Sequence, residues 1–394
     1  MKKALTLLLF VCILVSGASA LAQQEGVQIT FIEKKEGGSS LRYPQLQGLP
    51  NTFVQDTINR AIFEKGGIAL HEVTMTSPAQ QGATGVQVSS DAYLLTKESQ
   101  PAVLSLVILA EGKMPNGRLG YTATPMMFSL ADGSEIPPDV LWTDKQKAQE
   151  FLDAWVEDIS QKDIFTYSDL SGAAPVPLNS VMLTDTGIRV YYPLESFTQL
   201  SGRAGAFSYY FYEVAGILQT GEDSLLGTLD AWKSSQVSAE TKELIESTLA
   251  GGMLPGIPNV MRQSIREVSQ QYKELTDSEA FITGERHVLE DAVFRDVSLI
   301  VPFRGEEITG ILTRRISLFG LDTGSTENQA VAQVLGEPET TLPLDADTAA
   351  QYAMVAGTAS FYTMGEYRLM LNFDTDGILQ SVYLSKESSL GAST

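Results

Sequence analysis

Few residues of this sequence have the types and spacing that catalysis or metal binding requires. The two histidines, His71 and His287, lie far apart, and the single cysteine, Cys12, belongs to the apolar N-terminal segment. Zinc sites are built mainly from clustered cysteine and histidine ligands. The acidic segment 374–377 (DTDG) resembles the start of a calcium loop, but no ligands follow at the later positions. The sequence therefore predicts no metal site and no cofactor, and a hairpin turn at 374–377.

Motifs of covalent and nucleotide-dependent enzymes are also missing from the sequence. It contains no Gly-x-Ser-x-Gly elbow, no Ser-x-x-Lys set of the penicillin-binding kind and no glycine-rich phosphate-binding fingerprint. Two carboxylates can hydrolyse a glycosidic bond, but 48 acidic residues allow very many pairs. A carboxylate-dependent cell-wall hydrolase thus stays an alternative to which no particular residues can be assigned, and we expect no enzyme.

A row of aromatic residues is the most unusual local feature. Tyr209, Tyr210, Phe211 and Tyr212 follow one another inside a predicted strand from Phe207 to Val214. Successive side chains of a strand point to opposite faces, so Tyr210 and Tyr212 would share one face. Burial on both faces under a helix is one interpretation. Exposure as binding anchors is the other, because tyrosine is enriched at binding hot spots.

The N-terminal residues predict export from the cell. Lys2 and Lys3 precede an apolar run from Ala4 to Val15, and Ala-x-Ala motifs end at Ala20 and Ala22. This order is typical of a cleaved signal peptide, which we assign to residues 1–22. A retained anchor is the alternative, since the uncharged stretch is at the short end of a membrane-spanning length. We expect an extracellular or cell-envelope protein with no membrane segment after cleavage.

Composition limits the classes of partner. The net charge is −21, and −23 once Lys2 and Lys3 are removed. Such a charge repels nucleic acid and anionic lipid and attracts cationic partners, although solubility alone would also account for it. A mean hydropathy of zero and 43% hydrophobic residues exclude a disordered acidic tail. The mature chain would have no cysteine and no disulfide, which favours a bacterial surface over an animal secreted protein.

The pattern of turns and apolar stripes predicts an α+β fold: two domains with mainly antiparallel sheets packed on helices, joined by a helical connector. The first domain, 23–224, has strands expected at 27–32, 102–110, 121–130 and 188–192. Asn51 and Thr143 are expected to cap its two helices. The second of these helices should bury Ala148, Phe151, Leu152, Trp155 and Ile159.

The connector, 225–284, lacks β-branched runs and is expected to be helical, with one helix ended by Gly251 and Gly252. A smaller α+β domain is expected at 285–394. Its strands should lie at 294–302 and 310–319, followed by a helix that Ser325 caps and Gly336 ends. A terminal hairpin should join 367–373 to 378–384.

Residues 121–214 resemble a domain of unknown function from Gram-positive surface proteins, found in the ectodomain of the lysozyme-sensing anti-sigma factor of bacilli and fused to peptidoglycan deacetylases. The matching motifs are YTATPMMF at 121–128, LxDGxEI at 130–136, Leu141-Trp142, and GIRVYYPLE at 187–195. Leu194 stands where the family tends to have tyrosine. Residues 325–384 are similar to small modules with a β-lactamase-inhibitor-protein-like fold.

The resemblance implies a non-enzymatic binding or sensing protein whose partner is a cationic protein such as lysozyme, or a cell-wall component. The candidate binding residues are Tyr192 and Glu195 of the family-like element, with Tyr210 and Tyr212 of the aromatic row. A purely structural envelope protein is a further alternative.

Overall fold

The computed structural model describes residues 26–76, 84–113, 119–160, 174–192, 206–271, 279–289 and 296–386. The segment expected to be a signal peptide and candidate residue Glu195 lie outside these ranges. Within them, no helix combines the length and the apolar character needed to cross a membrane.

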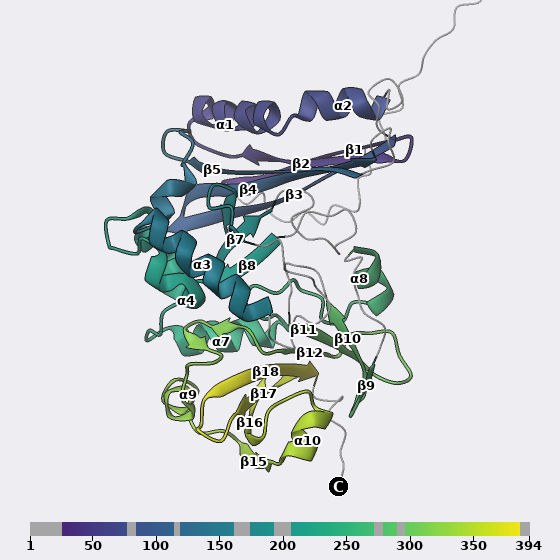
Figure 1. The fold of residues 1–394 in the computed structure, drawn as a ribbon, viewed down its shortest axis with the longest axis vertical. Helices are drawn as coiled ribbons and strands as arrows, with labels where there is room; N and C mark the ends of the chain where they lie inside the picture. Colours follow the sequence, from purple (N-terminus) through teal and green to yellow (C-terminus); the bar gives the residue numbers. More distant parts are fainter. Residues whose placement is uncertain are drawn as a thin grey trace, which may run out of the picture.

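A five-stranded sheet covered by two helices forms the first layer (Figure 1). Its strands follow chain order, with all neighbours antiparallel except the short parallel pair β2–β3. Asn51 caps α1 as predicted, since its side-chain oxygen accepts hydrogen bonds from the amides of Phe53 and Val54. The elements are β1 (Gln28–Glu36), β2 (Ser39–Gln47), α1 (Thr52–Lys65), α2 (Ile68–Thr76), β3 (Thr84–Lys97), β4 (Gln100–Lys113) and β5 (Leu119–Ser129).

A three-stranded sheet and a long helix pack on the other side of this layer and build a second core. Asp144, rather than Thr143, caps the helix α3, because its carboxylate accepts from the amides of Gln146 and Lys147. Phe151, expected to be buried, is 40% exposed, whereas Leu152 is fully buried. The elements are η1 (Pro138–Leu141), α3 (Lys145–Ser160), β6 (Val181–Leu183), β7 (Gly187–Tyr191) and β8 (Ala206–Tyr210).

Only the first part of the strand predicted at 207–214 is a strand in the structure. β8 ends at Tyr210, and the next residues form the short helix α4 (Phe211–Val214). The amide of Tyr210 donates to the Glu213 carboxylate over 2.8 Å, which closes the first turn of the helix. Tyr210 and Tyr212 therefore do not share a strand face, although their rings stack with centroids 5.9 Å apart.

Helices follow in the expected connector. They are α5 (Leu225–Thr228), α6 (Asp230–Ser234), α7 (Thr241–Ala250) and α8 (Ile265–Gln271), and the short helix η3 (Ala215–Ile217) precedes them. Ile245 and Leu249 of α7 are fully buried against the C-terminal sheet, so the connector packs into the body of the protein. Gly252 takes the left-handed conformation, φ +74°, directly after the helix, as the paired glycines predict.

An eight-stranded antiparallel sheet forms the C-terminal part, with strand order β15-β16-β17-β18-β12-β11-β10-β9. Ser325 does not cap α9, which begins after Glu327 without a side-chain cap, while Gly336 ends it as predicted. Asp374 accepts from the amides of Asp376 and Ile378, which forms the predicted hairpin turn. The elements are β9 (Glu279–Phe281), β10 (Gly284–Leu289), β11 (Val297–Val301), β12 (Gly310–Thr313), β13 (Ser317–Leu318), β14 (Leu321–Asp322), α9 (Asn328–Leu335), β15 (Thr340–Leu344), α10 (Ala346–Gln351), β16 (Gly357–Met364), β17 (Tyr367–Phe373) and β18 (Leu379–Lys386).

The α+β class with mainly antiparallel sheets is confirmed. Below, the N-terminal unit means residues 26–218 and the C-terminal unit means residues 279–386, with the connecting helices between them. The N-terminal unit contains two cores rather than one, because both faces of its five-stranded sheet are covered. The eight-stranded sheet likewise has a core on each face.

Candidate functional site

A buried ion pair joins the two units. Arg315, which lies between β12 and β13, reaches across the junction to Glu213 of α4, and its Nη2 lies 2.7 Å from Oε2. Both side chains are about nine-tenths buried. The same guanidinium donates to the carbonyl oxygen of Ser208 and lies over the ring of Trp155, 4.9 Å from its centroid. The contact fixes the C-terminal unit against α3, β8 and α4.

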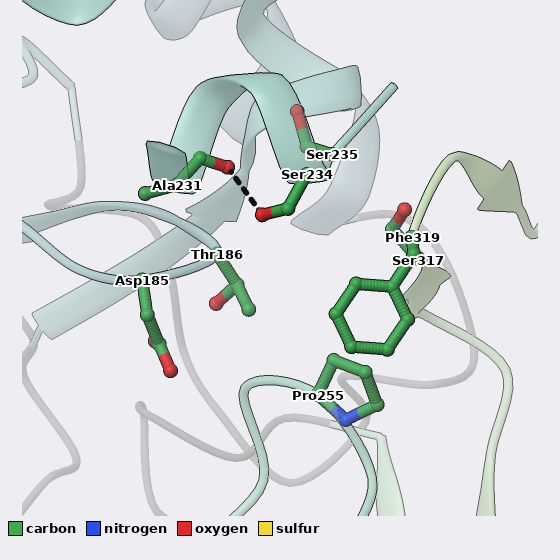
Figure 2. A pocket seen from close by; sticks show the side chains of 8 residues that line it. All are labelled: Asp185, Thr186, Ala231, Ser234, Ser235, Pro255, Ser317 and Phe319. Carbon is green, nitrogen blue, oxygen red and sulfur yellow. Dashed lines mark hydrogen bonds between the residues drawn. The ribbon is translucent and has the colours of Figure 1, made fainter. Parts of the chain in front are cut away.

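A pocket also opens between the two units, where three parts of the chain meet (Figure 2). Its empty volume is about 260 Å³, part of which is open to solvent. One wall is the β6–β7 turn of the N-terminal unit, a second is the connecting segment around α6 and Pro255, and a third is the β13–β14 turn. The lining residues are Asp185, Thr186, Ala231, Ser234, Ser235, Pro255, Ser317 and Phe319.

The hydrogen bonding of the β6–β7 turn positions Asp185 and Thr186. The hydroxyl of Thr184 accepts from the amides of Thr186 and Gly187, and the carbonyl oxygen of Thr186 accepts from the amide of Phe211 over 3.0 Å. Gly187 is required here, since a Cβ would lie 1.9 Å from the carbonyl oxygen of Tyr209. The turn is therefore held rigidly at the edge of the pocket.

Asp185 is the single carboxylate among the residues that line this pocket. Asp185 is exposed to solvent, yet nearby protein atoms partly desolvate its carboxyl group and raise the pKa of that group. The positive charge of Arg189 offsets part of this shift. A carboxylate with a perturbed pKa at the edge of a pocket is a candidate for a functional role.

The β13–β14 turn presents an aromatic ring to the pocket at a conformational cost. Phe319 and Gly320 are the two central residues of a hairpin in which Leu318 pairs with Leu321. Both have positive φ, +52° for Phe319 and +94° for Gly320. Such turns favour asparagine, aspartate or glycine at the first position, and a phenylalanine there is strained. Strained backbone of this kind is concentrated at ligand sites.

The structure places the candidate tyrosines inside the protein rather than on an open surface. Tyr192 is 2% exposed and packs edge-on against Phe207 with ring centroids 5.9 Å apart. Tyr210 and Tyr212 are partly buried at the junction, where the hydroxyl of Tyr212 lies 3.3 Å from that of Thr323. Tyr192 is thus a core residue, and Tyr210 and Tyr212 connect the two units. Burial of the aromatic row was the first of the two interpretations.

The pocket does not supply the chemistry of the hydrolase alternative. A glycoside hydrolase uses two carboxyl groups about 5–10 Å apart, whereas the lining of this pocket contains Asp185 alone. Within the described ranges, no three histidine, cysteine, aspartate or glutamate side chains gather into a group that would hold a metal ion.

The sequence predicted one strand over 310–319, whereas β12 ends at Thr313 and Ser317 and Phe319 belong to the separate β13–β14 hairpin. The sequence gives no local signal for the pocket, because its walls come from separate segments spread between residues 185 and 319. One signal was available: a phenylalanine preceding a glycine between two short apolar strands is an unusual residue for such a turn.

Comparisons with known proteins found likenesses to solved structures over parts of the chain only. No family model and no curated protein matches the sequence. A DUF4309 family protein of Bacillus subtilis is similar over 39% of this chain and 99% of its own length, with 15% identity and a TM-score of 0.27. A DUF3298 family protein of Bacteroides fragilis is similar over 51% of this chain and 96% of its own, with 10% identity and a TM-score of 0.35.

Another DUF3298 family protein, from Pseudomonas aeruginosa, is similar over 49% of this chain and 94% of its own, with 12% identity and a TM-score of 0.32. DUF3298 is the ectodomain family of the lysozyme-sensing anti-sigma factor that the sequence motifs resemble. At these identities and TM-scores the likenesses do not assign the chain to either family.

Proposed function

We propose that this protein is a non-enzymatic extracellular or cell-surface binding module whose partner is a cationic protein of the lysozyme kind. The observation that carries the proposal is the excess of negative charge, −21 over the whole chain. A charge of this size steers oppositely charged partners toward the surface.

This charge cannot be neutralised within the molecule. The 27 basic side chains can each neutralise at most one of the 48 acidic side chains. Each ion pair inside the protein, such as Arg315 with Glu213 or Arg314 with Asp296, removes one charge of each sign and leaves the excess unchanged. A large negative surface therefore remains for an external partner.

The resemblance of residues 121–214 to the ectodomain of a lysozyme sensor supports lysozyme as the first partner to test. Lysozyme attacks the cell wall, so a surface protein that binds it would act as a sensor or as a shield. A cell-wall component carrying amino groups is the other partner compatible with the charge.

Isothermal titration calorimetry tests the proposal directly. We expect native lysozyme to bind the intact protein saturably at low ionic strength. Lysozyme whose lysines have been succinylated carries the opposite charge and should not bind. Poly-lysine is the control for unspecific attraction and should bind without a defined stoichiometry. An absence of native lysozyme binding at low salt would contradict the proposed partner.

A further inference from the structure

We propose that the pocket between the two units binds a single protonated amine, the side chain of a lysine on the basic partner. This inference rests on the proposed function, because it identifies the group of the partner that the protein recognises. Asp185 would pair with the ammonium group, and Phe319 and Pro255 would contact the aliphatic part of the side chain.

The first argument is that Asp185 and Ser234 present hydrogen-bond acceptors at the pocket. The hydroxyl of Ser234, which lies beside the opening in Figure 2, donates its hydrogen to the carbonyl oxygen of Ala231 over 3.2 Å. A serine has one hydrogen to donate, so lone pairs remain for the ligand. The ionised carboxylate of Asp185 also only accepts. An ammonium group, with three donors and no acceptor, matches these atoms.

The second argument is the apolar part of the lining. Figure 2 shows the Phe319 ring and Pro255 facing the same space as Thr186. Lysine buries its four methylene groups along apolar surface while the charged end contacts polar groups. An aromatic ring near the ammonium adds a cation–π attraction. The strained backbone of Phe319, with φ +52°, holds this ring at the pocket.

The size of the pocket points to one small group. The empty volume of about 260 Å³ includes open solvent, and the enclosed part has room for little more than one water-sized group. An ammonium group is of that size, so the methylene groups of the lysine would lie in the open part, along Phe319 and Pro255. Gly256 contributes to this shape, because a Cβ there would lie 2.8 Å from the Thr186 hydroxyl and the loop could not approach so closely. A hard metal ion prefers six or more oxygen ligands with several carboxylates, which a lining with one carboxylate does not offer.

The ligand should be lost in acid as Asp185 takes up a proton. The charged and titratable groups that face Asp185 are Arg189, Tyr93 and Tyr210. Arginine stays charged and tyrosine stays neutral across the acid range, so Asp185 is the group that titrates there. Because burial raises its pKa, amine binding should weaken at a higher pH than an ordinary aspartate would give.

Amide chemical shifts of the intact, isotope-labelled protein test the site without any protein partner. The probe is Nα-acetyl-lysine amide, and the control probe is its Nε-acetylated form, which has no charge. We expect saturable shifts at Thr186, Ser234 and Phe319 with the first probe alone. Asp185→Asn should weaken this binding by about tenfold or more, as removing a charged hydrogen-bonding partner does. The control Asp223→Asn removes the same charge from an exposed position and should leave binding unchanged.

Two results would overturn the inference. One is the absence of saturable shifts up to the solubility limit of the probe. The other is equal binding by the wild type and Asp185→Asn. A lysozyme titration of the same variants separates this failure from that of the proposed function. If lysozyme binds both proteins equally, the pocket is not the anchor while the proposed function stands. If the amine binds the pocket and lysozyme binds neither protein, lysozyme is not the partner, while the proposed amine site is supported.

Discussion

Replacing Arg315 with methionine should destabilise the junction strongly. The substitution keeps most of the apolar stem but leaves the carboxylate of Glu213, which is 10% exposed, without its partner. Breaking a buried ion pair by removing one partner costs about 3–5 kcal/mol, because the other charge stays desolvated. The lost hydrogen bond to Ser208 and the lost contact with the Trp155 ring act in the same direction.

Urea unfolding followed by tryptophan fluorescence measures this loss. All three tryptophans lie at positions 142, 155 and 232, in the N-terminal unit and the connecting helices, so the signal reports on one side of the junction. Circular dichroism at the same urea concentrations reports on the whole chain. If the two curves separate in the variant, the units have lost their mutual stabilisation.

Two controls make the interpretation specific. Lys145→Met breaks an exposed pair with Asp139, whose side chains are 55% and 62% exposed, and should cost at most about 1 kcal/mol. The double variant Arg315→Met with Glu213→Leu removes both charges and should recover most of the lost stability. If the unfolding free energy of Arg315→Met alone lies within about 1 kcal/mol of the wild-type value, Glu213 is not a buried, unpaired carboxylate in this variant, because such a group would cost more.

Two further substitutions test smaller features. Gly252→Ala should lower the unfolding free energy by more than about 1 kcal/mol, because its Cβ would lie 2.6 Å from the Tyr367 ring. The control Gly324→Ala has a similar φ of +80° but no atom near its Cβ. If both variants lose the same unfolding free energy, the positive φ and not the contact with Tyr367 is the cause. Asp322→Asn should raise the melting temperature at neutral pH, because burial and the nearby charge of Glu213 raise the pKa of the Asp322 carboxyl group. Because the pKa of Asp322 is raised in the folded state, the wild type is more stable in acid, where this carboxyl group is protonated, and loses that stability as pH rises through the folded-state pKa. The higher melting temperature of Asp322→Asn should therefore disappear below the ordinary pKa of aspartate. A melting temperature that is higher by the same amount at every pH would show that the charge of Asp322 is not the cause.

Local signals in the sequence predicted those elements whose ends are set by neighbouring residues. Asn51 caps α1 through amides two and three residues away, and Asp374 forms its turn in the same way. The second cap was misassigned by one residue, to Thr143 instead of Asp144. Both residue types are good caps, and only the geometry of the chain decides between them.

Elements that depend on distant partners were not predictable in this way. A continuous strand over the aromatic row agrees with β propensity, but Glu213 turns the chain into α4 and is itself held by Arg315, which is 102 residues away. The pocket has the same origin, since Asp185, Pro255 and Phe319 become neighbours only after both units have packed on the connecting helices. Tyr192 was named from the family-like element and Tyr210 and Tyr212 from the aromatic row, and neither pattern tells a buried tyrosine from an exposed one.

The association rate of lysozyme with the intact protein, measured at increasing salt concentrations, shows directly whether the negative charge attracts the partner. Raising the ionic strength from about 0.01 M to about 0.15 M shortens the screening length from roughly 30 Å to about 8 Å. If the −21 charge steers a cationic partner, the association rate constant should fall by about tenfold or more, while the dissociation rate constant changes far less. An association rate constant that does not depend on salt, or an absence of binding at the lowest salt, would contradict the account.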